Sequence, residues 1–151
     1  KKYKFKVYQQ TSQKNFLSLK LFYQANKIEN VLFDFDEDIS ALMNRVNICL
    51  TRAGASTLAE LVFLNIPHLA IPLPTAKDNH QFENAFFYNQ HGCNWILNQK
   101  EINDNNLTNK LFNIIDNKEM YLNKKKNMKN FSYQNTWNNV NQKIISTINE
   151  N

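Results

Sequence analysis

The residues best suited to chemistry fall in two polar segments, each of which follows a short apolar run. The first segment, Thr51–Glu60, contains one of the two glycines of the 151-residue chain. A glycine in such a turn favours a left-handed backbone or a close approach to a ligand. The candidate phosphate-binding residues are the small or hydroxylated ones of this turn, Gly54, Ala55, Ser56 and Thr57. They leave a helix N-terminus open, and its free amide groups and positive dipole end attract a phosphate.

Glu60 ends this first segment, one turn into the expected helix. A carboxylate at that point can accept two hydrogen bonds from the hydroxyls of a ribose. An ordinary strand-to-helix turn, in which Glu60 only complements the helix dipole, explains the same spacing. Taken alone, the first segment does not decide between a nucleotide site and a structural turn.

The second segment, Pro72–Ala85, leads from a proline-stiffened loop into a helix. The first turns of this helix carry His80, Gln81 and Asn84. His80 and Asn84 are four residues apart and therefore share a helix face. An imidazole and neutral amides at a helix start are suited to binding sugar hydroxyls. The alternative is a helix capped by Asp78, with solvated polar side chains in its first turns.

The remaining reactive side chains predict no further site. His68 and His91 are interpreted as structural, and Cys49 and Cys93 as free thiols within apolar or mixed segments. A nucleophile–base pair of Cys49 and His80 is disfavoured, because Cys49 is expected inside a buried strand. These side chains are too scattered for a metal site, and neither a metal nor a cofactor is expected.

Composition indicates a folded globular chain, with 42% hydrophobic and 21% charged residues. No apolar run approaches the roughly 20 residues of a membrane-spanning helix, so we expect any membrane contact to be peripheral. The net charge is +5, much of it in Lys1–Lys6 and Lys124–Lys129. A basic surface suits nucleic acid, anionic lipid or a diphosphate, although a solvated helix face is the simpler alternative. No motif of a nucleic-acid reader accompanies the charge, so no nucleic-acid partner is expected.

Apolar patterning places strands and helices alternately along the chain. Strands are expected at 4–8, 31–35, 46–50, 67–71 and 95–97, and helices at 16–26, 39–44, 58–64, 80–91 and from about 105 onward. The run 46–50 is nearly all apolar, as in a strand buried on both faces. The acidic turn Asp36–Asp38 is expected to cap the helix that follows it. The C-terminal helices carry two apolar stripes, one at Leu107, Leu111, Ile114 and Ile115 and one at Val140, Ile144, Ile145 and Ile148.

This alternation predicts an α/β fold, a Rossmann-like parallel sheet with flanking helices. Ligands of such sheets bind beyond the carboxyl ends of the strands. Both polar segments, Thr51–Glu60 and Pro72–Ala85, follow an expected strand and therefore lie at that edge.

Three blocks of sequence together resemble the C-terminal domain of the MurG family, the UDP-N-acetylglucosamine:N-acetylmuramyl-(pentapeptide) pyrophosphoryl-undecaprenol N-acetylglucosaminyltransferases. The blocks are Phe35–Ile39, Arg52–Leu61 and Lys77–Ala85. The resemblance covers about residues 4–97 and extends more loosely into the C-terminal helices. It implies the C-terminal half of a GT-B glycosyltransferase.

The resemblance also implies roles for individual residues. Glu60 matches the acid that binds the ribose hydroxyls, and the backbone at Asp36 matches the segment that reads uracil. The residues that match the turn near the diphosphate and sugar are Ala55, Ser56 and Thr57. The residues that match those reading the N-acetylglucosamine hydroxyls are His80, Gln81 and Asn84.

By this resemblance, residues 1–151 are an incomplete UDP-sugar-binding domain, with C-terminal helices from about 105 to 151. The first strand and Gly-rich loop of the family are missing, as is the N-terminal domain with its proposed catalytic base. The intact enzyme is expected to move N-acetylglucosamine, with inversion, from UDP-N-acetylglucosamine to undecaprenyl-linked muramyl-pentapeptide in peptidoglycan synthesis. This fragment alone is expected to be inactive.

Two alternatives remain open: the donor domain of another UDP-sugar transferase of this fold, and a non-catalytic donor-fold subunit that recruits a partner. The expected partners of the intact protein are UDP-N-acetylglucosamine, the lipid-linked muramyl acceptor through the missing half, and an anionic membrane surface. The expected location is peripheral, on the cytoplasmic face of the bacterial inner membrane, and free cysteines suit that reducing compartment.

Overall fold

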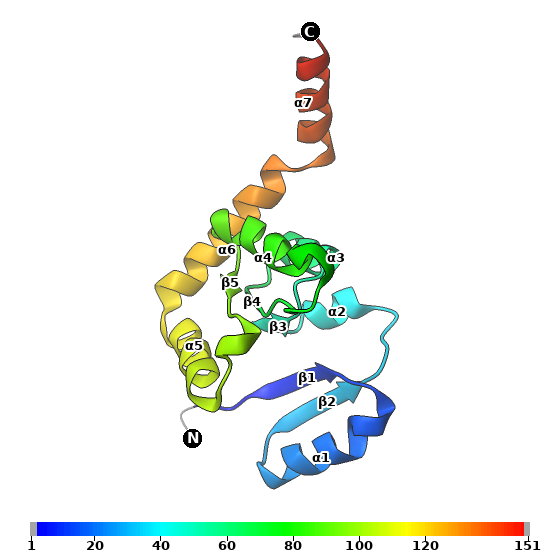
Figure 1. Cartoon of the computed structure of the whole chain (residues 1–151), viewed down its shortest axis with the longest axis vertical. Coiled ribbons are helices and arrows are strands. Elements are labelled where there is room, and N and C mark those ends of the chain that lie inside the picture. Colours follow the sequence, from blue (N-terminus) through cyan, green and yellow to red (C-terminus); the bar gives the residue numbers. More distant parts are fainter. Residues whose placement is uncertain (1–2, 150–151) are drawn as a thin grey trace. The chain divides into compact units, whose positions relative to one another are not determined.

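The computed structural model describes residues 3–149, so Lys1 and Lys2 of the basic N-terminal run lie outside the described residues. The chain divides into two compact units, Lys1–Leu42 and Met43–Asn151, which are described separately below. Helices and strands alternate in both (Figure 1). This alternation, with parallel pairing throughout, confirms the predicted α/β class.

The first unit is a parallel β-α-β arrangement followed by a short helix. Its elements are β1 (Lys6–Gln10), a 3-10 turn (Gln13–Asn15), α1 (Phe16–Ala25), β2 (Glu29–Phe33) and α2 (Ile39–Met43). Lys6 pairs with Glu29 in the β1–β2 register, and their side chains form an ion pair. Among residues 3–42 only Tyr23 is buried, and its hydroxyl donates to Gln9 Oε1 at 2.5 Å. Asp38 Oδ1 accepts from the Ala41 amide at 3.0 Å, which confirms the predicted capping of the helix that follows the acidic turn.

The second unit is built on a three-stranded parallel sheet of order β3-β4-β5. Its strands and the helices between them are β3 (Cys49–Thr51), α3 (Ala55–Phe63), β4 (His68–Ala70), a 3-10 turn (Lys77–Asn79), α4 (His80–Gln90) and β5 (Trp95–Ile96). A 3-10 turn (Gln99–Glu101) then leads into α5 (Asp104–Asp116), α6 (Lys118–Gln134) and α7 (Trp137–Asn149). The predicted strands and helices are thus all present. The strands β3, β4 and β5 are shorter than expected, whereas β1 and β2 have the expected length and are shifted by two residues.

The hydrophobic core lies in this second unit, around the central strand β4, whose three residues are all buried. Three clusters of buried side chains make up this core. They are Ala53, Leu58, Ala70 and Ala85; Leu69, Trp95, Leu97 and Ile114; and Val62, Cys93 and Met128. The first cluster joins α3 and α4 to β4, and its small alanines let both helices approach the sheet closely. The packing that fixes the two helix starts is therefore part of the core.

Two sheet predictions need correction. The strands hydrogen-bond in two sheets, β1-β2 and β3-β4-β5, rather than in one. β3 is not buried on both faces, since Leu50 is 44% exposed. The physical reason is position: β3 is an edge strand of its sheet, whereas β4 has a strand on either side.

The C-terminal helices differ in how far their apolar stripes are covered. In α5, Ile114 is buried, and Leu107 and Leu111 pack in the same cluster. Asn103 begins that helix with a capping box, its side chain accepting from the Asn105 and Asn106 amides. In α7 the helix is confirmed, yet its isoleucines at 144, 145 and 148 are all more than half exposed. The apolar pattern therefore predicted the α7 helix correctly, but no described part of the chain covers the isoleucines on its apolar face.

Candidate functional site

The two polar segments meet at one edge of the three-stranded sheet. Thr51 pairs with Ala70 in the register, so β3 and β4 end level with each other. The chain leaves β3 through a three-residue turn into α3, and leaves β4 through a longer loop into α4. Both helices thus begin beyond the carboxyl ends of neighbouring strands, where ligands of parallel sheets bind.

Gly54 is the N-cap residue of α3, with an extended backbone (φ −67°, ψ 136°). The left-handed backbone considered from sequence is therefore wrong. A Cβ at this position would meet only Thr57 Oγ1, at 3.7 Å, which is an ordinary van der Waals contact. The fold itself therefore does not require glycine here. No side chain caps α3, so the first-turn amide groups of Ala55, Ser56 and Thr57 have no partner within the helix.

Gln81 ties the two segments together. Its Oε1 accepts a hydrogen bond from the Ala53 amide at 3.2 Å and from the Leu73 amide at 3.0 Å. Ala53 lies in the turn before α3, and Leu73 lies in the loop after β4. One side-chain oxygen thus holds both loops, and the Nε2 donors of Gln81 are not engaged in this tie.

Asn84 strengthens the same junction, because its Nδ2 donates to the Ala53 carbonyl at 3.0 Å. The buried Ala53 therefore has both of its backbone polar groups bonded to α4 side chains. Arg52 adds a third link, with Nη1 3.3 Å from the Ile71 carbonyl and 2.7 Å from Gln99 Oε1. Sequence reasoning gave neither Arg52 nor Gln99 a role, and no local pattern pairs residues 47 positions apart.

The start of α4 has an unusual backbone. Asp78 and Asn79 both have positive φ, 51° and 56°. Two consecutive non-glycine residues in the left-handed region are uncommon and cost energy, which tends to be tolerated at functional sites. The N-cap of α4 is Asn79, without a side-chain cap. The alternative of a helix capped by Asp78 is therefore wrong.

His80 is exposed at this helix start, and its Nδ1 lies 2.7 Å from the Lys77 carbonyl. A carbonyl only accepts, so Nδ1 is the donor in this contact. Glu60 is exposed on α3, four residues after the exposed Ser56, so the two share a helix face. Of the predicted site residues in the second unit, Gln81 and Asn84 are joined directly to the turn before α3 by hydrogen bonds.

Asp36 belongs to the first unit, in the turn before α2. Its Oδ1 accepts from the Asp38 amide at 2.9 Å. The carboxylate therefore stabilises the acidic turn itself. This leaves the backbone of the turn, rather than the side chain, for the recognition role predicted at Asp36.

The cysteines are poor nucleophiles, in agreement with the sequence interpretation. Burial raises the pKa of Cys49 and of Cys93 to about 11, so both remain protonated thiols near neutral pH. His68 is fully buried in β4, with Nδ1 3.0 Å from the Ile66 carbonyl, and burial lowers its pKa. These groups contribute to packing and offer no reactive pair.

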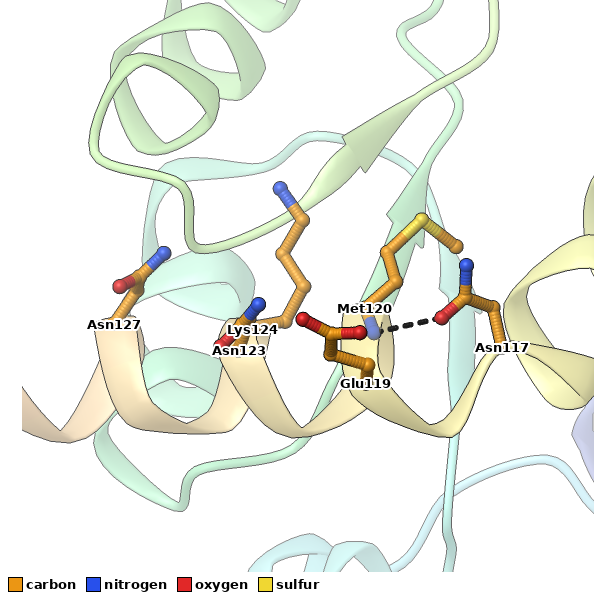
Figure 2. Close-up of a pocket in the computed structure, with 6 residues that line it drawn as sticks. All are labelled: Asn117, Glu119, Met120, Asn123, Lys124 and Asn127. Carbon is orange, nitrogen blue, oxygen red and sulfur yellow. Dashed lines mark hydrogen bonds between the residues drawn. The ribbon is translucent and has the colours of Figure 1, made fainter.

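A shallow depression of about 400 Å³ lies along α6. It is lined by Asn117, Glu119, Met120, Asn123, Lys124 and Asn127, and contains none of the predicted site residues (Figure 2). Within residues 3–149, no three His, Cys, Asp or Glu side chains gather as metal ligands. In the same range, no helix is long and apolar enough to cross a membrane.

Comparison with known protein families shows the family to which this chain belongs. Residues 1–140 match the model of the glycosyltransferase family 28 C-terminal domain. The chain therefore belongs to the family of glycosyltransferase family 28 C-terminal domains.

Its curated relatives are more specific in name. Over all 151 residues it is 64% identical to the UDP-N-acetylglucosamine--N-acetylmuramyl-(pentapeptide) pyrophosphoryl-undecaprenol N-acetylglucosamine transferase of Pelagibacter ubique. It is 32% identical over 125 residues, or 83% of the chain, to the transferase of the same name from Rickettsia bellii. The chain spans 42% and 35% of the length of these two relatives.

Solved structures support the fold alone. The chain is similar to MurG of Acinetobacter baumannii, with a TM-score of 0.73 and 23% identity over 85% of this chain and 38% of that one. It is more distantly similar to the spinosyn forosaminyltransferase SpnP, with a TM-score of 0.51 and 12% identity over 84% of this chain and 40% of that one. Because both transferases share this architecture, the fold by itself does not identify the sugar.

Proposed function

We propose that this chain is the donor-binding part of a transferase that moves N-acetylglucosamine from UDP-N-acetylglucosamine to undecaprenyl-linked muramyl-pentapeptide. Membership of glycosyltransferase family 28 supports the reaction class. The name of the Pelagibacter ubique relative, at 64% identity, supports this donor and acceptor. Residues 1–151 then correspond to the UDP-sugar-binding domain, and the chain spans 42% of the length of that relative.

The observation that carries the proposal is the junction at the carboxyl ends of β3 and β4. Gln81 and Asn84 hold the turn before α3 against the start of α4 by two hydrogen bonds, and Gln81 accepts a third from Leu73 in the loop after β4. A diphosphate at the α3 N-terminus would meet the free amides of Ala55, Ser56 and Thr57 and the positive end of the helix dipole. A sugar attached to it would then extend toward α4, toward His80 Nε2, Gln81 Nε2 and Asn84 Oδ1.

Glu60 supplies the ribose contact in this arrangement, because an exposed carboxylate one turn into α3 can accept from two vicinal hydroxyls. The family resemblance suggests the turn backbone at Asp36, in the first unit, for the uracil contact. No residue of the described chain is proposed as the catalytic base.

The chemistry is direct displacement at the anomeric carbon by the muramyl 4-hydroxyl, with inversion. The bond from that carbon to the diphosphate breaks, and UDP departs with the bonding electron pair. The muramyl hydroxyl gives its proton to a general base, which we assign to no residue of the described chain. Amide groups at the α3 N-terminus and the Thr57 hydroxyl stabilise the charge that develops on the leaving diphosphate. Residues 1–151 alone would bind the donor weakly and transfer nothing.

The proposed location is peripheral, on the cytoplasmic face of the inner membrane, where a lipid-linked acceptor is accessible. The proposed product is the disaccharide-linked lipid used in peptidoglycan synthesis, and hence in cell-wall growth, shape and division.

Glu60→Ala in the full-length protein tests the nucleotide site. A hydrogen bond to a charged group contributes about 1.5–3 kcal/mol, so the loss of two should weaken UDP binding about a hundredfold or more. Calorimetry measures the affinity, and circular dichroism checks the fold. Glu119→Ala, another exposed helical glutamate, is the matched control and should bind UDP normally. Unchanged UDP affinity in Glu60→Ala would exclude Glu60 as the ribose acid.

A second measurement tests the sugar. Saturation-transfer NMR should show stronger contacts from UDP-N-acetylglucosamine than from UDP-glucose, and this preference should shrink in Asn84→Ala. Equal binding of the two donors by the unaltered protein would favour another UDP-sugar transferase. Donor binding without any transfer by the full-length protein would favour a non-catalytic subunit.

A further inference from the structure

The side chain of Arg52 crosses the carboxyl edge of the three-stranded sheet. Arg52 is the first residue of the turn from β3 into α3, and the sheet order places β4 between β3 and β5. Its Nη1 donates to the Ile71 carbonyl, after β4, at 3.3 Å and to Gln99 Oε1, beyond β5, at 2.7 Å. One guanidinium group therefore links the exits of all three strands, in the turn that leads into α3.

The backbone that carries Gln99 is anchored in the core. Gln99 begins the 3-10 turn after β5, and its carbonyl accepts from the Ile102 amide at 3.1 Å. The Ile102 side chain packs against the buried cluster that contains Trp95. Gln99 therefore offers its side-chain oxygen to Arg52 from a turn whose position is set by core packing.

The partners of Arg52 hold its charge in place without neutralising it. Both acceptors, the Ile71 carbonyl and the Gln99 amide oxygen, are neutral groups. Glu101, the carboxylate in the same turn as Gln99, accepts instead from Asn98 Nδ2 at 2.9 Å. No ion pair to any described residue involves Arg52. Its positive charge is therefore uncompensated at the sheet edge where the diphosphate is proposed to bind.

The contact between Arg52 and Gln99 contributes little to the stability of the fold. Both side chains are exposed, so water can replace either partner when the other is removed. What the contact does restrict is the conformation of a long side chain with many rotamers. A side chain that is already ordered binds a ligand without paying that loss of freedom again. The contact therefore suits ligand binding better than it suits folding.

We propose that Gln99 is a positioning residue of the donor site and acts through Arg52. Its side-chain oxygen holds Nη1 of Arg52, which leaves the Nε and Nη2 donors for the diphosphate of a UDP-sugar at the α3 turn. Charge-assisted hydrogen bonds from a planar guanidinium group to phosphate are strong and often paired. This inference rests on the proposed function for the identity of the ligand.

Calorimetric titration of the full-length protein with UDP and with uridine tests this role, because only UDP carries the diphosphate. Gln99→Ala should weaken UDP binding about two- to tenfold, the effect of leaving one long side chain unordered, and should leave uridine binding unchanged. Gln99→Glu keeps an acceptor but neutralises the charge of Arg52, so it should also weaken the binding of UDP alone. Equal losses of UDP and uridine affinity, or full UDP affinity in Gln99→Glu, would overturn the inference.

A double-mutant cycle shows whether Gln99 acts through Arg52. Arg52→Met should weaken UDP binding more than Gln99→Ala does, and adding Gln99→Ala to Arg52→Met should weaken it no further. Additive losses would show that the two residues act independently and would overturn the inference. Gln134→Ala, at an exposed glutamine of α6, is the matched control and should bind UDP like the unaltered protein.

The proposed function and the role of Gln99 are distinguished by the same titrations. If the unaltered protein did not bind UDP, the proposed function would be wrong, and this inference with it. If the unaltered protein and Gln99→Ala bound UDP equally well, only the role of Gln99 would be wrong. Circular dichroism of each variant checks that the fold is retained.

Discussion

Gln81 illustrates how one residue can serve the fold and a ligand at once. Its Oε1 joins the turn before α3 to the loop after β4, through the amides of Ala53 and Leu73. Ala53 is fully buried, so its amide has no access to water as a replacement partner. The sugar-reading role proposed for Gln81 therefore depends on the Nε2 group, which the tie does not use.

This division of roles makes two substitutions at Gln81 differ. Gln81→Ala leaves the buried Ala53 amide unpaired and should lower the free energy of unfolding by about 1–3 kcal/mol. Gln81→Glu keeps an acceptor oxygen and should retain most of the stability, while losing the donors that would face the sugar. Urea unfolding measures the first effect and UDP-N-acetylglucosamine titration the second. Equal stability of Gln81→Ala and the unaltered chain would show that the tie contributes nothing.

At the scale of elements, the C-terminal helices show that an amphipathic pattern does not by itself mean that the apolar face is buried. α5 places Ile114 in the core with Leu69 and Trp95. α7 also carries an apolar stripe, yet Ile148 is 67% exposed, and α7 extends away from the sheet of its unit (Figure 1). The free energy that burial contributes should therefore differ between two helices of similar pattern.

Matched isoleucine substitutions test this difference. Ile114→Ala removes a fully buried side chain and should cost about 2–5 kcal/mol of unfolding free energy. Ile145→Ala alters a side chain that is more than half exposed and should change it by no more than about 0.5 kcal/mol. Both are measured by urea unfolding of the 151-residue chain. A cost at Ile145 as large as that at Ile114 would mean that the α7 stripe is covered in solution.

At the scale of the whole molecule, burial is unevenly distributed between the two units. All three core clusters lie within Met43–Asn151. In the first unit, α1 packs on β2 and reaches β1 through the Tyr23–Gln9 hydrogen bond, and Tyr23 is the only buried residue among residues 3–42. Two-stranded sheets with little buried area have low intrinsic stability. Local opening should therefore be easier in the first unit.

Hydrogen exchange followed by mass spectrometry measures this directly. Backbone amides of His68–Ala70 should exchange slowest, because β4 is central and wholly buried. Amides of Lys6–Gln10 and Glu29–Phe33 should exchange much faster at the same pH and temperature. Equal protection of both sheets would show that the two units unfold as one cooperative structure.

Several features of this fold could be predicted from the sequence alone. The strand–helix alternation, the Asp38 cap, the two polar turns and the family resemblance all depend on residues close together in the chain. Hydrophobic period, capping residues and turn chemistry act over a few positions, so they can be read without knowing distant contacts. The expected positions of α3 and α4 followed from these local signals.

Only the tertiary structure decided how distant residues meet. The bonds from Gln81 and Asn84 to Ala53 join residues about thirty positions apart, and the bond from Arg52 to Gln99 joins residues 47 apart. The edge position of β3, the extended Gly54 backbone and the exposed stripe of α7 also depend on what lies next to each element in space. Such neighbours are selected by packing of the whole unit, which no local pattern specifies.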